Sequence, residues 1–340
     1  MIKRRTFIKA STVIAALAAS APYSVRAQQE IPVVATFSIL GNMVERIGGS
    51  AVTVTTLVGR NGDTHVFQPT PADAKAVKRA SVLFTNGLEF EGWLDRLAEA
   101  AEFDGELVVT TNGIETISLQ EHGDDEHGDE GGEDEKQHDD EQAESKDDHD
   151  GETQGDDHHG GEFDPHGWQS LQNAIVYVNN ITAALAKTSP SNASTFYANR
   201  AAYVEEIESL DREIRNMIAA LPSSARTIVT SHDAFQYFGR DYGLTFLAPQ
   251  GLSTESEASA RDVAQLIEQI RAENISAVFV ENVADPRLVQ QIATETGIIV
   301  GGKLFPGALS NEDGAAATYL DMMRHNATTI ATALTKANQP

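Results

Sequence analysis

Residues 192–221 read NASTFYANRAAYVEEIESLDREIRNMIAAL, and this stretch decides the expected architecture. Apolar side chains recur in it at every third or fourth position, which is the spacing of one face of an α-helix. These side chains are Phe196, Tyr203, Ile207, Leu210, Ile214 and Ile218. Pro222 ends the pattern, because proline cannot continue a helix. At about 1.5 Å per residue such a helix is about 45 Å long, which suits a rigid connection between two lobes.

Short β-rich segments alternate with helical segments on both sides of this helix. Before it, strands are expected at 31–36, 52–58, 81–85 and 106–111, and helices at 39–47, 71–79, 91–100 and from 168 to about 187. After it, strands are expected at 227–230, 245–248, 277–281 and 298–301, and helices at 234–242, 259–273, 286–296 and about 313–334. This alternation predicts two α/β lobes, each with a mainly parallel sheet flanked by helices. The expected division is an N-terminal lobe at 28–190, a linking helix at 191–222 and a C-terminal lobe at 223–340.

Residues 1–27 have the features of an export signal. Basic residues at positions 3–9 precede a short apolar stretch, and Val25-Arg26-Ala27 resembles a cleavage site. Arg4-Arg5 is typical of a twin-arginine signal, with an ordinary Sec signal as the alternative. No later stretch reaches 18 apolar residues and the chain has no cysteine. We therefore expect a soluble periplasmic monomer with no membrane insertion, no lipid anchor and no thiolate metal ligands.

Residues 120–162 interrupt the N-terminal lobe with a segment of different composition. This window holds 20 Asp or Glu residues, two Lys and six His, and it carries −18 of the chain's net charge of −26. That charge argues against nucleic acid as a partner, and the lack of apolar side chains predicts a disordered loop. Its histidines are His122, His127, His138, His149, His158 and His159. We expect them to capture metal ions weakly; a solubilising linker with incidental histidines is the alternative.

Three further histidines lie where expected strands end or expected helices begin. His65 follows the strand at 52–58, His166 precedes a helix within Asp164-Pro165-His166-Gly167-Trp168, and His232 lies between a strand and a helix. Ligands of open α/β sheets bind beyond the carboxyl ends of the strands, and a helix N-terminus favours the neutral imidazole that binds metal. Three neutral imidazoles suit Zn²⁺. No short motif links these residues, so a capping or surface role for each stays open at this point.

Several segments resemble the zinc-binding substrate proteins of bacterial ABC-type metal importers, a group that includes manganese-binding adhesin-like proteins. They are Asp63-Thr64-His65, Asn86-Gly87-Leu88 with Glu91-Gly92-Trp93-Leu94, Asp164-Pro165-His166-Gly167-Trp168, Ser231-His232-Asp233-Ala234-Phe235, Val278-Phe279-Val280-Glu281 and residues 318–326. The resemblance implies a metal site in the cleft between two α/β lobes, with His65, His166 and His232 as ligands. It also implies one tightly bound Zn²⁺, delivery to a membrane permease for zinc uptake, and a periplasmic zinc chaperone as a second candidate partner.

The sequence departs from this family at one expected ligand. Many relatives carry an Asp where this chain has Gly307, and glycine has no side chain to donate. The fourth ligand is left open between water, a nearby carboxylate such as Glu312 or Asp313, and a histidine of the acidic loop. We expect Asp313 to lie in the first turn of the last helix. Three histidines and a missing carboxylate favour zinc over manganese, because Mn²⁺ prefers oxygen ligands.

Three other functions share these features. A zinc enzyme also uses three histidines and an open position, but it needs a general base. Asp63 and Asp233 are the nearest candidates, and we expect them to cap turns or orient ligands, so we expect no catalytic residues. A zinc buffer would share the site without a transporter. A manganese-binding adhesin-like protein would differ in metal selectivity.

Overall fold

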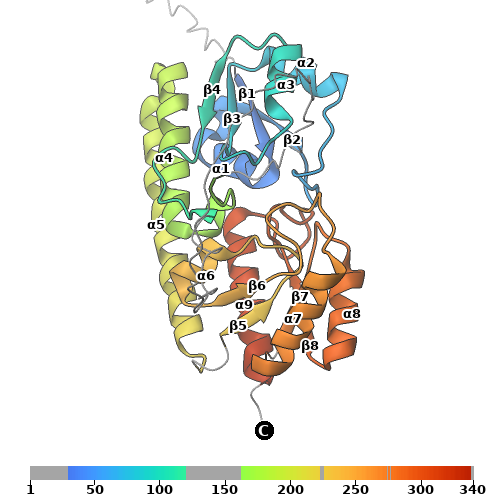
Figure 1. Cartoon of the computed structure of the whole chain (residues 1–340). Helices are drawn as coiled ribbons and strands as arrows, with labels where there is room; N and C mark the ends of the chain where they lie inside the picture. Colours follow the sequence, from blue (N-terminus) through green and yellow to red (C-terminus); the bar gives the residue numbers. More distant parts are fainter. Residues whose placement is uncertain (1–29, 120–161, 223–225, 274, 276, 338–340) are drawn as a thin grey trace, which may run out of the picture.

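Two four-stranded sheets, all of whose pairings are parallel, form the two lobes of the computed structural model (Figure 1). The strand order is β2-β1-β3-β4 in the first sheet and β6-β5-β7-β8 in the second. The strands are β1 Ile31–Phe37, β2 Val52–Val58, β3 Val82–Thr85, β4 Glu106–Val109, β5 Thr227–Val229, β6 Thr245–Leu247, β7 Ala277–Glu281 and β8 Ile299–Leu304. The predicted fold class is therefore confirmed. In each sheet the chain order reverses beside the first strand, and such a point is where open α/β sheets bind ligands.

The structure describes residues 30–119, 162–222, 226–273, 275 and 277–337. The expected export signal at 1–27 and residues 120–161 of the acidic segment lie outside these ranges. In the described part of the chain no helix is long and apolar enough to cross a membrane. The domain boundaries expected from the sequence stay a prediction.

Helices cover the faces of both sheets (Figure 1). The α-helices are α1 Ser38–Gly48, α2 Pro71–Arg79, α3 Leu94–Ala100, α4 Leu171–Thr188, α5 Ala193–Ala219, α6 Gln236–Tyr242, α7 Ala260–Glu273, α8 Pro286–Thr296 and α9 Tyr319–Ala337. Short 3₁₀ turns are η1 Gly49–Ala51, η3 Gly167–Gln169 and η4 Pro190–Asn192. Helix α5 runs alongside both lobes and packs against α1 and α4 of the first lobe and α6 and α9 of the second.

The core continues from one lobe into the other. All six side chains of the stripe predicted for α5 are buried, and they belong to the same apolar cluster as Phe37 of the first lobe and Phe279 of the second. A second, smaller cluster lies in the outer part of the C-terminal lobe. Each fully buried large apolar side chain contributes about 1.5–3 kcal/mol. Separating the lobes would expose many of them, so the shared core opposes a wide hinge motion.

The last helix begins later than the sequence pattern suggested. It starts at Tyr319, and Asp313 lies exposed in the turns that precede it, so the expected place of Asp313 in the first helical turn was wrong. Thr318 caps the helix, because its hydroxyl accepts a hydrogen bond from the Asp321 backbone N–H at 3.2 Å and donates to the Asp321 carboxylate at 2.6 Å. Arg60 donates to the carbonyl oxygens of Ser310 and Ala317, both at 2.8 Å, which holds the preceding turns.

The acidic segment leaves and re-enters the first lobe at one place. Ser118 and Phe163 form an antiparallel bridge, and the Leu119 N–H donates to the Glu162 carbonyl at 3.1 Å. The next bond along this ladder joins the Asp164 N–H to the Ile117 carbonyl at 2.9 Å. The two ends of the acidic segment are therefore held together at this ladder, whose second strand ends two residues before His166.

Candidate metal centre

Three histidine side chains from both lobes meet at one point between the sheets. One nitrogen of each of His65, His166 and His232 lies within 4.8 Å of the other two, and their ring centroids are 5.5–5.9 Å apart. His65 follows β2, His166 precedes η3, and His232 follows β5. No other His, Asp or Glu within the described ranges joins this group. The structure therefore brings together the three histidines that the sequence singled out.

Asp164 fixes the orientation of His166. Its Oδ1 accepts hydrogen bonds from the His166 backbone N–H at 2.9 Å and from the ring Nδ1 at 2.8 Å. With Nδ1 as donor, the lone pair of Nε2 is left available. Nε2 is buried and has no hydrogen-bond partner among the described residues. A buried, unpartnered nitrogen that faces two other imidazoles is what a metal ion would satisfy.

Glu281 holds His232 in the same manner from the end of β7. Its Oε2 lies 2.5 Å from His232 Nδ1, and its Oε1 accepts from the backbone N–H groups of Ser231 at 2.9 Å and His232 at 3.2 Å. Burial lowers the pKa of His232, but the charge and hydrogen bond of Glu281 outweigh it, so that the pKa is raised overall. The carboxylate thus increases the basicity of the ring that faces the cluster.

The ring of His65 is neutral. Burial, together with the nearby His166 and His232, lowers the pKa of His65 to about 2. The Asp63 carboxylate accepts from the His65 backbone N–H at 3.0 Å, and the Trp93 indole donates to the Thr64 carbonyl at 2.9 Å. These bonds fix the turn that presents His65.

Carboxylates, rather than helix N-termini, hold the rings of His166 and His232. His166 precedes only a 3₁₀ turn, and α6 begins four residues after His232. The lowering of the pKa expected from a helix N-terminus does not dominate at His232, whose pKa, despite burial, Glu281 raises. No role for Asp164 or Glu281 was predicted from the sequence. Glu281 could have been predicted as a site residue from its position at the carboxyl end of a buried strand.

A second buried network supports the His166 segment. The carboxylate of Glu91 accepts hydrogen bonds from the Asn86 N–H at 2.7 Å and from the Thr36 hydroxyl at 2.6 Å. The side chain of Asn86 in turn donates to the Pro165 carbonyl at 2.9 Å. Burial raises the pKa of Glu91, although the hydrogen bonds from Thr36 and the Asn86 backbone oppose that effect. This network ties the end of β3 to the residue before His166.

Aromatic rings form one wall of the centre. The ring of Phe90 lies 5.0 Å from that of His65 and 4.7 Å from that of Trp168, and Trp168 lies 5.3 Å from His166. An apolar wall lowers the local dielectric constant and so strengthens the interaction between a cation and its ligands. It also restricts access of water to two of the three histidines.

Gly307, where many relatives are expected to carry a ligand Asp, lies beside Trp168. Gly307 follows Pro306, whose carbonyl accepts hydrogen bonds from the side chains of Trp168 at 2.7 Å and Gln169 at 2.6 Å. A Cβ on Gly307 would meet only Trp168, at 3.9 Å. Glu312 and Asp313 are exposed and do not join the histidine cluster. The side chain of Asp233 accepts from Gln236 at 2.7 Å, as a turn-capping residue would.

The remaining histidines lie outside the cluster or outside the described residues. The six histidines at 122–159 lie outside the described residues. His325 lies on α9 and donates to the Lys303 carbonyl at 2.9 Å, away from the cluster. Trp93, Trp168 and Tyr319 are buried and hydrogen-bonded to backbone carbonyls, as structural side chains are.

Residues 33–333 match the model of a protein family described as the periplasmic zinc-uptake complex component A. The chain belongs to this family. It is therefore a metal-binding substrate-binding protein of an ABC transporter, whose partner is a membrane permease. The matched span includes all three histidines and nearly all of both lobes.

Individual relatives carry names for different metals. The chain is 32% identical to the manganese-binding lipoprotein MntA of Bacillus subtilis, over 91% of each chain. It is 28% identical to the iron-binding protein YfeA of Yersinia pestis, over 89% of this chain and 86% of that protein. The solved structure of the periplasmic zinc-binding protein TroA from Treponema pallidum superposes with a TM-score of 0.75, at 27% identity over 90% of this chain and 99% of that one. The lipoprotein names among the relatives weigh against the expectation that the chain has no lipid anchor.

Proposed function

We propose that this protein captures Zn²⁺ outside the cytoplasm and delivers it to the permease of an ABC zinc importer. The observation that carries this proposal is the donor set. Three imidazoles converge, and no carboxylate among the described residues joins them. Imidazole nitrogen suits Zn²⁺, whereas Mn²⁺ favours sites rich in oxygen. The carboxylates of Asp164 and Glu281 contact the Nδ1 atoms of His166 and His232. A carboxylate at the second ring nitrogen is the arrangement that orients zinc-binding histidines.

Manganese is the second candidate metal, because relatives of 28–32% identity are named for it. A single experiment separates the two. Zn²⁺ and Mn²⁺ are titrated into the metal-free mature protein in competition with a chelator, in parallel with the His65→Ala/His166→Ala/His232→Ala variant. We expect one tight Zn²⁺ that outcompetes Mn²⁺ and is lost in the variant. Tighter binding of Mn²⁺, or tight Zn²⁺ binding that survives in the variant, would contradict the proposal.

The acidic segment is proposed to concentrate Zn²⁺ for this centre. Its composition supports weak capture, since carboxylates attract divalent cations and imidazoles bind them reversibly. Both of its ends are held at the bridge between Ser118 and Phe163, close in sequence to Asp164 and His166. A metal ion bound in the segment would therefore stay near the cleft at a high effective concentration.

A further inference from the structure

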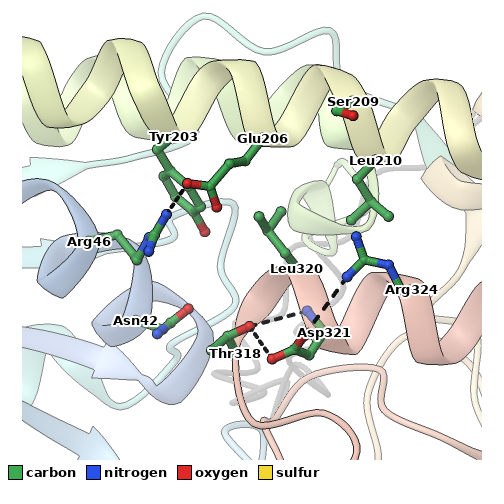
Figure 2. A pocket seen from close by; sticks show the side chains of 10 residues that line it. All are labelled: Asn42, Arg46, Tyr203, Glu206, Ser209, Leu210, Thr318, Leu320, Asp321 and Arg324. Carbon is green, nitrogen blue, oxygen red and sulfur yellow. Dashed lines mark hydrogen bonds and ion pairs between the residues drawn. The ribbon is translucent and has the colours of Figure 1, made fainter.

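A pocket of about 300 Å³ lies between α1, α5 and α9 (Figure 2). Asn42 and Arg46 reach it from the first lobe, Tyr203 and Glu206 from the linking helix, and Asp321 and Arg324 from α9. None of the three clustered histidines lines it. A ligand bound here would contact both lobes and the helix that joins them.

The side chain of Tyr203 leaves a hydrogen-bond donor unused in this pocket. Tyr203 is 2% exposed, and its hydroxyl has no hydrogen-bond partner among the described residues. Figure 2 shows the hydroxyl between Arg46 and Leu320. Burial raises the pKa of Tyr203, so the hydroxyl keeps its proton and can donate it. An unpaired buried hydroxyl is costly, and an acceptor atom from a ligand would remove that cost.

Two arginines supply positive charge to this pocket, and Arg46 is the one beside Tyr203. One nitrogen of Arg46 contacts a Glu206 oxygen at 2.5 Å, and its guanidinium carbon lies 4.9 Å from the centre of the Tyr203 ring. Arg324 makes only long contacts, at 3.3 Å or more to Glu213 and 3.9 Å to Asp321. Both guanidinium groups therefore retain N–H donors for a carboxylate.

Carboxylate oxygens supply the opposite charge in the same pocket. Glu206 uses Oε1 for Arg46, and Asp321 uses Oδ2 for the Thr318 hydroxyl at 2.6 Å. The second oxygen of each carboxylate makes no hydrogen bond to the described residues. The pocket thus offers positively charged donors on two arginines and negatively charged acceptors on two carboxylates.

We propose that this pocket binds a small zwitterion of the α-amino acid class. The carboxylate of such a ligand pairs with the Tyr203 hydroxyl and the guanidinium groups, and its ammonium pairs with Glu206 and Asp321. A ligand of zero net charge is not repelled by a chain whose net charge is −26. At about 30 Å³ per water molecule the pocket has room for about ten waters, which is more than the volume of a medium-sized amino acid. This binding is independent of the proposed zinc function.

The test uses the metal-free mature protein, so that complexes of amino acids with zinc do not contribute. Each of the twenty common amino acids is screened by saturation-transfer NMR, and positive ones are titrated by calorimetry. Malonate, which lacks the ammonium group, and cadaverine, which lacks the carboxylate, serve as probes of each half of the pocket. We expect at least one amino acid to bind saturably at one site and both probes to bind more weakly.

Variants locate the binding. Tyr203→Phe removes only the unpaired hydroxyl, and we expect it to weaken binding of the amino acid about fivefold or more. Arg324→Gln, at a half-exposed side chain, should do the same without affecting the core. The matched control is Tyr197→Phe, which removes a hydroxyl from an exposed position of the same helix, and its affinity should equal that of the wild type. Failure of every amino acid to bind, malonate binding as tight as the best amino acid, or unchanged affinity in Tyr203→Phe and Arg324→Gln would overturn the proposal.

Discussion

The carboxylate of Glu281 bridges the ring and the backbone of His232. One oxygen contacts Nδ1 at 2.5 Å, and the other accepts from the His232 N–H at 3.2 Å. The carboxylate therefore fixes both the position of the residue and the nitrogen that faces the cluster. We expect Glu281→Gln to weaken zinc binding about 10- to 100-fold, which is the usual loss for a partner of a metal-binding histidine. Competition titration against a chelator measures it.

The matched control for Glu281→Gln is Glu312→Gln, at an exposed position outside the cluster. Its zinc affinity should equal that of the wild type. Equal affinities for all three proteins would show that Glu281 does not orient a zinc ligand.

Zinc affinity should fall as the pH falls, and the group responsible should be His232 rather than His65. The Nε2 proton of a charged His232 must leave before a metal binds, and the pKa of this ring is raised above 6.5. Affinity should therefore weaken as the pH falls through that raised pKa. His65, with a pKa of about 2, carries no proton to release near neutral pH. Calorimetry in buffers of different ionisation enthalpy counts the released protons, and Glu281→Gln should reduce the number released near neutral pH. Unchanged proton release in that variant would contradict this assignment.

Gly307 leaves space that a carboxylate can fill. Its backbone is not in the left-handed region and a Cβ meets nothing closer than 3.9 Å, so substitution is not strained. We expect Gly307→Asp to increase affinity for Mn²⁺ more than for Zn²⁺, because an added oxygen ligand suits manganese better. Gly307→Ala adds the Cβ without the carboxylate and should leave the ratio of the two affinities unchanged. A ratio in Gly307→Asp equal to that in Gly307→Ala would mean that the side chain does not reach the metal.

A side-chain hydrogen bond connects the His65 turn to the loop before α7. The Thr254 hydroxyl donates to Asp63 Oδ2 at 2.5 Å, while Asp63 Oδ1 accepts from the His65 N–H. We expect Thr254→Val to speed zinc dissociation by up to about 10- to 100-fold, which corresponds to the roughly 1.5–3 kcal/mol of a hydrogen bond to a charged group. Stopped-flow transfer to a chelator gives the rate. Thr254→Ser keeps the hydroxyl and should restore the slow rate; equal rates in all three would rule out this role.

Removal of residues 121–160 should leave the fold and the centre intact. The bridge between Ser118 and Phe163 lies outside the deleted stretch and closes the gap. We expect the melting temperature and the tight site to be unchanged, the weaker sites to disappear, and zinc loading to slow. Metal stoichiometry by calorimetry checks it. An unchanged stoichiometry would show that the acidic segment binds no metal.

The sequence by itself determined the elements and the three histidines. The alternation of strand and helix patterns and the apolar stripe of α5 depend on neighbours within one or two turns, so their periodicity is visible in a single chain. The histidines were candidates because they lie where expected strands end or expected helices begin, and the resemblance to known importer proteins then implied that they are ligands. Resemblance to known importer proteins then selected zinc capture among the functions that such a cluster permits.

Only the tertiary structure decided which groups act on these histidines. Glu281 is 49 positions from His232, and their contact exists because β5 and β7 are neighbours in the second sheet. The start of α9 likewise depends on Asn42 of the other lobe, whose side chain accepts from the Tyr319 N–H at 3.0 Å. The pocket around Tyr203 combines three helices in the same way. Contacts between segments far apart leave no periodic trace along the chain, because they follow from strand order and helix packing rather than from local spacing.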